Sequence, residues 1–447
     1  MANRLITACL TLLCQLVVAG LPAHASSFED EFENFNSEQT GTFERFNKDN
    51  ENAFNEAFVE QWRAFNNALT EPAPSLPKPR LQPGQDQPRQ TRNQGSATPA
   101  GPAQRTRTPT PRAGDFYGHP VLSLPLFRLP SLSGVQPNNL LAFRQQALDS
   151  NDFHELIHLL GFMQQRLKAD SYTTLALARR LCADYYPDNN NQLACSWILG
   201  QTHGLDVRLG ERQQHLLVLT ASAQQWYEQP YFDVDGQRLY IVNDEEYQGL
   251  SGDTFIQTRR HEDATALTRV GLSRSFEPAL SNMVATERYG AALQVDEDFV
   301  AWLYQLPLLT VKDYLDDPIP AYLSEQLADH FHSDTEPATT LFIRLLEELQ
   351  HWPYMIDEEQ FGAEKPLTLS ESLYFPYTDC EDRVYAMAAI SRTFLGLPIA
   401  ALRYPNHLSA AIQLEQRWQE ADPTYIGATL GMRQPPYQGL TPEWFYP

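Results

Sequence analysis

A single cysteine, Cys380, lies among acidic residues in the segment YFPYTDCEDR, residues 374–383. Neighbouring carboxylates disfavour a thiolate and so raise the pKa of a thiol. The residues that follow read as a buried helix that begins at the cysteine and ends at Gly396 and Pro398, before a strand. Unpaired amides at a helix N-terminus favour an anion and lower a thiol pKa. Acidic residues also suit a first helical turn, where we expect Asp379, Glu381 and Asp382 to cap amides and point away from the sulfur.

A base and a carboxylate follow the cysteine in the order that a thiol triad requires. His407 lies at or just before an alternating strand in NHLSAAIQL, and Asp422 follows in EADPTY. In such a triad the imidazole takes the thiol proton and the carboxylate fixes the imidazole tautomer. The order of Cys380, helix, strand, His407, strand and Asp422 therefore predicts nucleophilic acyl transfer.

Taken together, YTDCEDRVYAMAAISRTFLGLPIAAL, NHLSAAIQL and EADPTY resemble the core of the transglutaminase-like branch of the papain-like cysteine superfamily. The resemblance covers residues 340–435 and implies that Cys380 is the nucleophile, His407 the general base and Asp422 its orienting partner. It also implies an α+β fold in which the helix bearing the cysteine packs on an antiparallel sheet. The sequence departs from the family pattern at Thr378, where Gly is usual, and after His407, where Leu-Ser replaces Ala-Trp, so acceptor specificity stays open.

The remaining groups of such a site are less well defined. We expect the backbone N–H of Cys380 to be the first oxyanion donor, with Gln350 or Trp352 as candidates for the second. Some bacterial periplasmic members of the family are calcium-dependent proteinases, but the sequence contains neither a DxDxD-type calcium loop nor a Cys/His zinc cluster. We therefore predict no metal and no cofactor.

The first 115 residues are organised differently from the rest. Residues 1–25 have the pattern of a signal peptide: Arg4, an apolar run too short to span a bilayer, and Ala-His-Ala before the cleavage point. In residues 26–70, Phe recurs every 11 residues from Phe32 to Phe65, which predicts an amphipathic helix with one aromatic stripe. This helix could dock a partner protein or pack on its own domain. Residues 71–115 include ten prolines within 71–112 and predict a disordered linker.

Charge and cysteine count narrow the function classes further. A formal net charge of −23 argues against binding to nucleic acid or to anionic lipid surfaces. No segment after the signal is apolar enough to span a membrane. Signal removal leaves Cys182, Cys195 and Cys380, an odd number. Cys182 and Cys195 could pair in an oxidising compartment, which would leave Cys380 as a free thiol.

The globular part begins at about residue 116. Residues 116–250 contain four helical patterns (139–149, 151–167, 170–186 and 191–202) and two strand-like segments (205–221 and 230–243). Residues 251–336 are a mixed connecting region, and the catalytic domain spans 337–447, with a helix at 337–350. Residues 203–219 also align without gaps within 395–414, placing His215 on His407 and Asp188 at the thiol position. The segment 116–250 is therefore either a degenerate second copy of the unit or a coincidental likeness.

These features predict a periplasmic or secreted thiol enzyme that performs acyl transfer on amide bonds of a protein or peptide in the cell envelope. A peptidase or amidase is favoured over a cross-linking transglutaminase, because water is the commoner acceptor. The alternative is a catalytically inactive envelope adaptor that binds peptide through the same fold.

Overall fold

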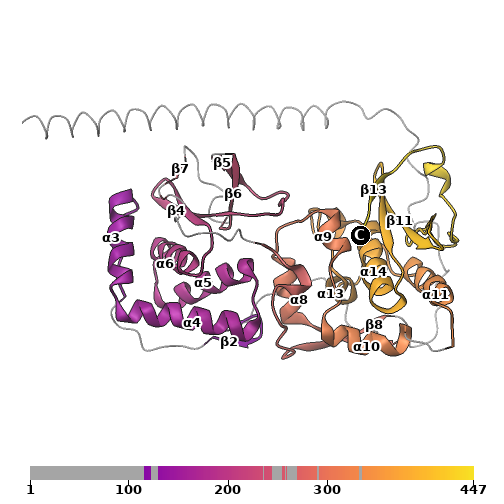
Figure 1. Ribbon diagram of the computed structural model, residues 1–447, viewed down its shortest axis with the longest axis horizontal. Helices are drawn as coiled ribbons and strands as arrows, with labels where there is room; N and C mark the ends of the chain where they lie inside the picture. The colour runs from indigo at the N-terminus through magenta and orange to yellow at the C-terminus, as the bar shows by residue number, and fades with distance from the viewer. Residues whose placement is uncertain are drawn as a thin grey trace, which may run out of the picture. The chain divides into compact units, whose positions relative to one another are not determined.

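The computed structural model describes residues 115–447, apart from 122–128, 235, 244–253, 257, 259–268, 289–290 and 332–334. The expected signal peptide (1–25), Phe-repeat helix (26–70) and nearly all of the Pro-rich linker (71–115) lie outside the described residues. The described chain combines helices with antiparallel sheets, so the predicted α+β class is confirmed (Figure 1). Within these described ranges, no helix is both long and apolar enough to cross a membrane.

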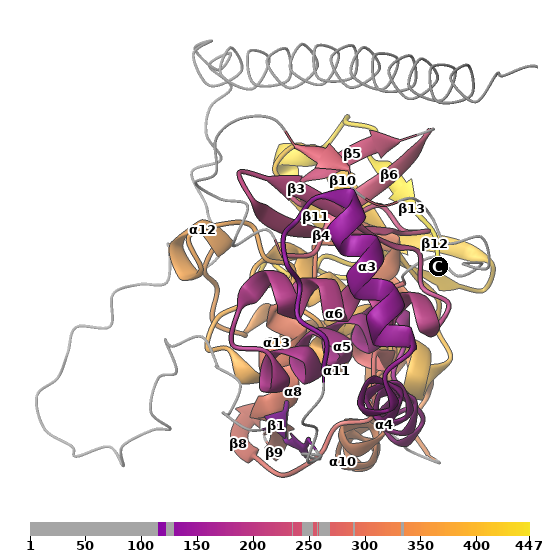
Figure 2. The ribbon, with the colours of Figure 1, turned by 90° about the vertical axis from the view of Figure 1, so that its left-hand side faces the viewer.

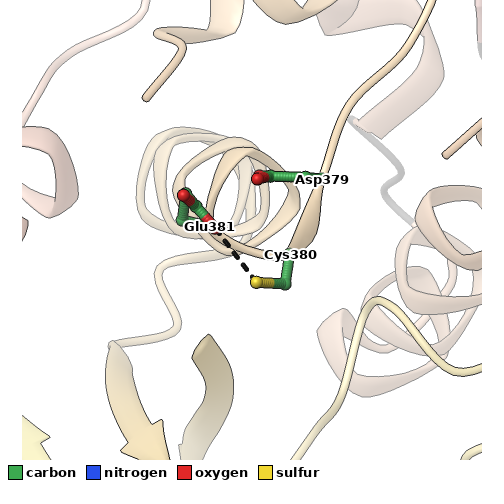
Figure 3. A group of neighbouring side chains, drawn as sticks. All are labelled: Asp379, Cys380 and Glu381. Carbon is green, nitrogen blue, oxygen red and sulfur yellow. Dashed lines mark hydrogen bonds between the residues drawn. The ribbon is translucent and has the colours of Figure 1, made fainter. Parts of the chain in front are cut away.

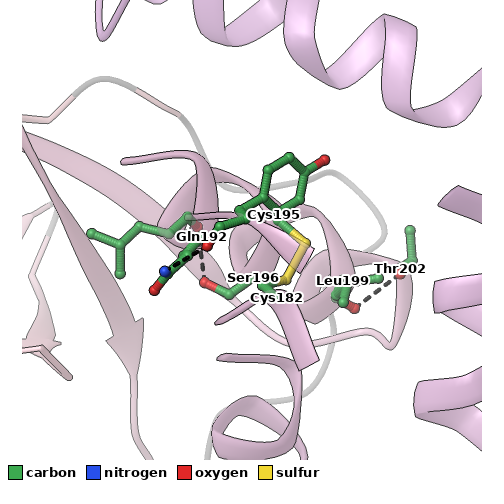
Figure 4. Close-up of a disulfide and its surroundings, with 8 residues drawn as sticks. Cys182, Gln192, Cys195, Ser196, Leu199 and Thr202 are labelled. Carbon is green, nitrogen blue, oxygen red and sulfur yellow. Dashed lines mark hydrogen bonds between the residues drawn. A yellow bond between two sulfur atoms is a disulfide. The ribbon is translucent and has the colours of Figure 1, made fainter. Parts of the chain in front are cut away.

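Four helices follow a short β1–β2 pair (Asp115–Phe116 and His119–Pro120) and match the predicted helical segments closely: α3 (Pro137–Leu148), α4 (Asn151–Leu167), α5 (Ser171–Tyr185) and α6 (Asn189–Thr202). Side-chain caps fix three of their starts. Ser150 accepts from the N–H of Phe153, Asp170 from the N–H of Thr173 and Asp188 from the N–H of Asn190. A buried disulfide between Cys182 and Cys195 joins α5 to α6, with a Cα–Cα distance of 5.9 Å (Figure 4). The pairing that the sequence left open is therefore present, and Cys380 is the free cysteine of the described chain.

A five-stranded antiparallel sheet follows these helices, in the order β5-β6-β4-β3-β7. Its strands are β3 (Val207–Arg212), β4 (His215–Ala221), β5 (Tyr231–Val234), β6 (Gln237–Ile241) and β7 (Phe255–Ile256). Gln213 and Gln214 connect β3 to β4 with φ values of 51° and 65°, the conformation of a tight two-residue hairpin turn. Helix α6 packs against β3 and β4, beneath them in the view of Figure 2.

The region between the two halves, which sequence patterns described poorly, is folded. It contains a short 3-10 helix (Leu272–Arg274), a hairpin of β8 (Met283–Arg288) and β9 (Ala291–Asp296), and helices α8 (Glu297–Tyr304), α9 (Val311–Leu315) and α10 (Ala321–Phe331). Helix α13 (Leu369–Tyr374) packs on this hairpin, and the Thr286 hydroxyl donates to the Leu373 carbonyl. One hydrophobic core extends from Phe116 through this region to Ala421.

The C-terminal half places one helix on a four-stranded antiparallel sheet, in the order β12-β11-β10-β13. Its elements are α11 (Ala338–Gln350), α12 (Asp357–Gln360), α14 (Cys380–Ile390), a π-helical turn (Ser391–Leu395), β10 (Ile399–Tyr404), β11 (His407–Leu414), β12 (Arg417–Glu420), a 3-10 turn (Pro435–Tyr437) and β13 (Glu443–Phe445). Helix α14 packs on β10 and β11 (Figure 1). The predicted arrangement, a cysteine-bearing helix on an antiparallel sheet, is observed.

Candidate active site

Helix α14 begins at Cys380, as the sequence predicts, and Asp382 fixes this start. The Asp382 carboxylate accepts from the N–H of Asp379 (3.1 Å) and from the N–H of Leu367 (2.8 Å). It therefore points away from the sulfur, as expected. Glu381 does not: the Cys380 thiol donates to its Oε2 at 3.0 Å, so the prediction was wrong for this carboxylate (Figure 3).

The thiol is consequently neutral in this structure. Burial, followed by the nearby charges of Glu381 and Asp379, raises the pKa of Cys380 well above its usual value. The opposing influence is the backbone N–H of Leu408, which donates to the sulfur at 3.5 Å. This contact holds Sγ against the start of β11, directly beside His407 in the chain.

His407 and Asp422 form a buried hydrogen-bonded pair. Nε2 of His407 lies 2.8 Å from Oδ2 of Asp422, and both residues are almost completely buried. The second carboxylate oxygen accepts from the N–H of Thr424 at 2.9 Å, which fixes the carboxylate in place. A ring nitrogen bonded to a carboxylate carries a proton, so Nδ1 is the ring nitrogen that can act as the acceptor.

Two tyrosines from the C-terminal segment hold the imidazole in position. The Tyr437 ring is nearly parallel to that of His407, with centroids 5.0 Å apart and an interplanar angle of 10°. The Tyr425 ring meets the imidazole edge-on at 5.5 Å, and the two tyrosine hydroxyls are 3.4 Å apart. No sequence pattern indicates these contacts, because they depend on the path of the chain after Asp422.

The structure thus brings two of the three predicted triad groups into direct contact. Among the described residues, no hydrogen bond joins the Cys380 thiol to His407; its partners are Glu381 and the Leu408 amide. Catalytic hydrogen bonds are often long or misaligned without substrate, so this geometry is compatible with a resting thiol. The thiol has to leave Glu381 before the imidazole can take its proton.

Gln350 has a structural role that excludes it as an oxyanion donor. Its Nε2 donates to the carbonyls of Asp422 (3.0 Å) and Ala428 (2.9 Å), while its Oε1 accepts from the N–H of Gly427 (3.1 Å). The prediction that this amide could serve the reaction is therefore wrong. Its side chain is committed to the loop that presents Asp422.

Arg383 is an organising residue that sequence reasoning did not identify. Its side chain is 1% exposed and donates to the Thr378 hydroxyl and to the carbonyls of Trp352, Pro423 and Thr424. Burial lowers the pKa of Arg383 to about 10. One guanidinium thus ties helix α14 to the loop after Asp422. Its place one helical turn after Cys380, on the buried face of α14, was the available signal.

A cluster of carboxylates lies beside the thiol and was not expected from the sequence. It contains Asp357 and Glu364 as well as Asp379, Glu381 and Asp382, in overlapping groups whose oxygens lie within 4.8 Å of one another. Burial, followed by repulsion between the carboxylates, raises the pKa of Asp379 and Asp382 well above the usual range. Burial likewise raises the pKa of Asp357 to about 7 and that of Glu364 to about 8.

These carboxylates can be stabilised in two ways. They can hold protons, as the raised pKa values indicate, or they can bind a hard divalent cation, since Ca²⁺ takes carboxylate oxygens in flexible geometries. No short sequence motif predicts the cluster, because Asp357 and Glu364 are distant from α14 in the sequence and approach it only in the folded chain.

Comparison with known proteins adds no relative: no family model, no curated protein and no solved structure matches this chain.

Proposed function

We propose that this protein is an exported thiol enzyme with a transglutaminase-like core that cleaves amide bonds by acyl transfer. Cys380 would be the nucleophile, His407 the general base and Asp422 the residue that orients it. The observation that carries this proposal is the buried His407–Asp422 pair, because His407 is the first residue of β11 and the next residue, Leu408, donates its N–H to the Cys380 sulfur.

The first half of the reaction would follow from these positions. The thiol turns from Glu381 toward the imidazole and gives its proton to Nδ1 of His407, while sulfur forms a bond to the amide carbon. The carbonyl electron pair moves to oxygen, where the N–H of Cys380 at the helix start can donate to it. Collapse of this intermediate expels the amine, which takes the proton from His407 and leaves a thioester.

In the second half, water attacks the thioester, with His407 again accepting a proton. The acid is released and the thiol is restored. An amine in place of water would give transamidation through the same intermediate. Hydrolysis is favoured because water is the abundant acceptor.

Two observations support a location outside the cytoplasm. Residues 1–25 have the signal-peptide pattern, and the buried Cys182–Cys195 disulfide suits an oxidising compartment. The expected substrate is therefore a protein or peptide of the cell envelope.

A non-catalytic peptide-binding adaptor is the second candidate. It is favoured by one observation, the neutral thiol bonded to Glu381 rather than to His407. To separate the two, the full chain is incubated with a mixed peptide library and new termini are read by mass spectrometry. The enzyme proposal predicts cleavage by wild type and none by Cys380→Ala or His407→Ala. Equal behaviour of all three proteins would support the adaptor.

A further inference from the structure

The two halves of the described chain share one arrangement of helix and strands. In each, a helix precedes a central hairpin: α6 precedes β3–β4, and α14 precedes β10–β11. A further strand pairs antiparallel with the second hairpin strand, β6 with β4 and β12 with β11. A last strand pairs antiparallel with the first hairpin strand, β7 with β3 and β13 with β10. Strand β5 is an addition at the outer edge of the first sheet.

The strand registers of the two sheets also agree. The first pair of each hairpin contains a histidine, His215 opposite Arg212 and His407 opposite Tyr404. When the hairpins are aligned on these histidines, the outer strands pair with aligned hairpin residues. Leu219 aligns with Ala411, and they pair with Ile241 and Glu420; Gly210 aligns with Leu402, and they pair with Ile256 and Trp444. A slip of one residue would exchange the two faces of a strand, so agreement in three ladders is a strong constraint.

The faces of the two sheets are used in the same way. Val207, Leu209 and Leu216 join α6 in the main core, and the aligned Ile399, Ala401 and Leu408 join α14 there. The opposite face of each sheet builds a small separate cluster. A glycine with positive φ follows each helix, Gly204 at 77° and Gly396 at 63°.

The positions of the candidate triad can therefore be read in the first half. The N–H of Leu216, which aligns with Leu408, donates to Oδ1 of Asn190 at 2.9 Å, as Leu408 donates to the Cys380 sulfur. Asn190, the second residue of α6, thus makes the strand contact that Cys380, the first residue of α14, makes in the other half. The sequence alignment put Asp188 at the thiol position, but Asp188 is the N-cap of α6.

The acid position is occupied by a buried asparagine. Asn243 lies two residues beyond Ile241, as Asp422 lies two beyond Glu420, and both are 2% exposed. Its side chain accepts from the N–H of Val218 (2.8 Å) and donates to the carbonyl of Leu216 (3.3 Å). It is bonded to the strand rather than to the imidazole, and His215 is exposed.

We propose that residues 188–256 are a second copy of the unit formed by residues 379–445, with Asn190, His215 and Asn243 at the positions of Cys380, His407 and Asp422. In this copy the side-chain amides of Asn190 and Asn243 accept from backbone N–H groups of β4, those of Leu216 and Val218 respectively. The chain therefore contains two such units, and the first has no thiol and an exposed histidine at the corresponding positions. The positional match stands whether or not Cys380 turns over a substrate.

Reinsertion of a thiol tests this equivalence. Asn190→Cys is made in the full chain carrying Cys380→Ala, and its rate of alkylation by iodoacetamide is measured from pH 5.5 to 9. Asp152→Cys in the same background is the matched control, because Asp152 is likewise the second residue of a helix, α4. Both thiols share the effect of a helix N-terminus.

A retained site geometry predicts a lower thiol pKa at position 190 than at position 152. A difference of about one unit would raise the thiolate fraction at pH 7 about eightfold. His215→Ala should slow labelling at 190 and leave labelling at 152 unchanged, and Asn243→Asp should quicken it at 190 by supplying a carboxylate for His215. Peptide mapping confirms the labelled residue and the intact Cys182–Cys195 disulfide.

Equal rates at 190 and 152, together with no effect of His215→Ala, would overturn the proposal. Asn243→Asp is not needed for this decision, so a folding defect in that variant leaves the test intact. Because every protein in the series lacks Cys380, failure here is distinct from failure of the proposed enzymatic activity.

Discussion

Glu381→Gln gives the sharpest prediction about the resting thiol. In the structure the Cys380 thiol donates to the Glu381 carboxylate at 3.0 Å, so a thiolate formed there would face a negative charge. Glutamine keeps the shape of the side chain, removes the charge and offers an N–H donor to the sulfur. We therefore expect the substitution to lower the pKa of Cys380.

The size of the effect follows from the distance. Two unit charges 3.0 Å apart repel by about 1.4 kcal/mol at the dielectric constant of water and by about 5.5 kcal/mol at an effective value of about 20. Cys380 and Glu381 are both partly exposed, which places the interaction in the lower part of this range. About 1.5–3 kcal/mol corresponds to a pKa decrease of about one to two units.

The assay is the pH dependence of alkylation of Cys380 by iodoacetamide, followed by intact mass. Glu381→Gln should react about ten- to a hundredfold faster than wild type at pH 7, since each pKa unit changes the thiolate fraction about tenfold. Glu359→Gln, an exposed residue of α12, is the control for loss of one negative charge. Identical pH profiles for wild type and Glu381→Gln would refute the idea that this carboxylate restrains the thiol.

Four further predictions concern the site and other buried groups. Tyr437→Ala should reduce peptide cleavage and shift its pH profile, whereas Tyr437→Phe should retain both, because the ring alone stacks on His407; equal losses in the two variants would contradict this. Arg383→Met should lower the free energy of unfolding by about 3 kcal/mol or more in urea titrations, because buried carbonyls lose their donor; a change below about 1 kcal/mol would argue against the role given to Arg383. Without divalent cations, stability should fall as the pH rises from about 4 to about 7, by up to about 1.4 kcal/mol per pH unit for each of Asp357 and Asp317. Burial raises the pKa of both carboxyl groups to about 7 in the folded chain, so the folded chain holds protons that the unfolded chain has already lost. Ca²⁺ should raise the melting temperature at pH 7.5, and Asp357→Asn should abolish this rise; a Ca²⁺ effect that survives in Asp357→Asn would place the cation elsewhere.

The elements that carry the site were predictable because their signals are local. The start of α14 at Cys380 follows from an acidic first turn and an apolar face, and the strand after it follows from the helix stop at Gly396 and Pro398. The pairing of His407 with Asp422 could be predicted because a tight turn joins the two antiparallel strands between them, which returns the chain to the His407 end. Glu415 and Gln416 form that turn, with φ values of 46° and 66°.

What could not be predicted depends on tertiary contacts or on single rotamers. Gln350 was one of two candidates for the second oxyanion donor, but its amide is used by the loop after Asp422, which packs against α11 only in the folded chain. The direction of the Glu381 side chain is a rotamer choice that no periodicity encodes. The approach of Asp357 to α14 likewise depends on the path of residues 351–368, which carry little regular structure.

The most direct test of the central claim is the detection of a thioester on Cys380. The full chain is mixed with p-nitrophenyl esters of short N-acylated peptides, quenched in acid and measured by intact mass and peptide mapping. The account predicts one acyl group on Cys380 in wild type, slower acylation in His407→Ala and no adduct in Cys380→Ala. Folded wild-type protein that carries no acyl group on Cys380, while releasing nitrophenol no faster than Cys380→Ala, would contradict it.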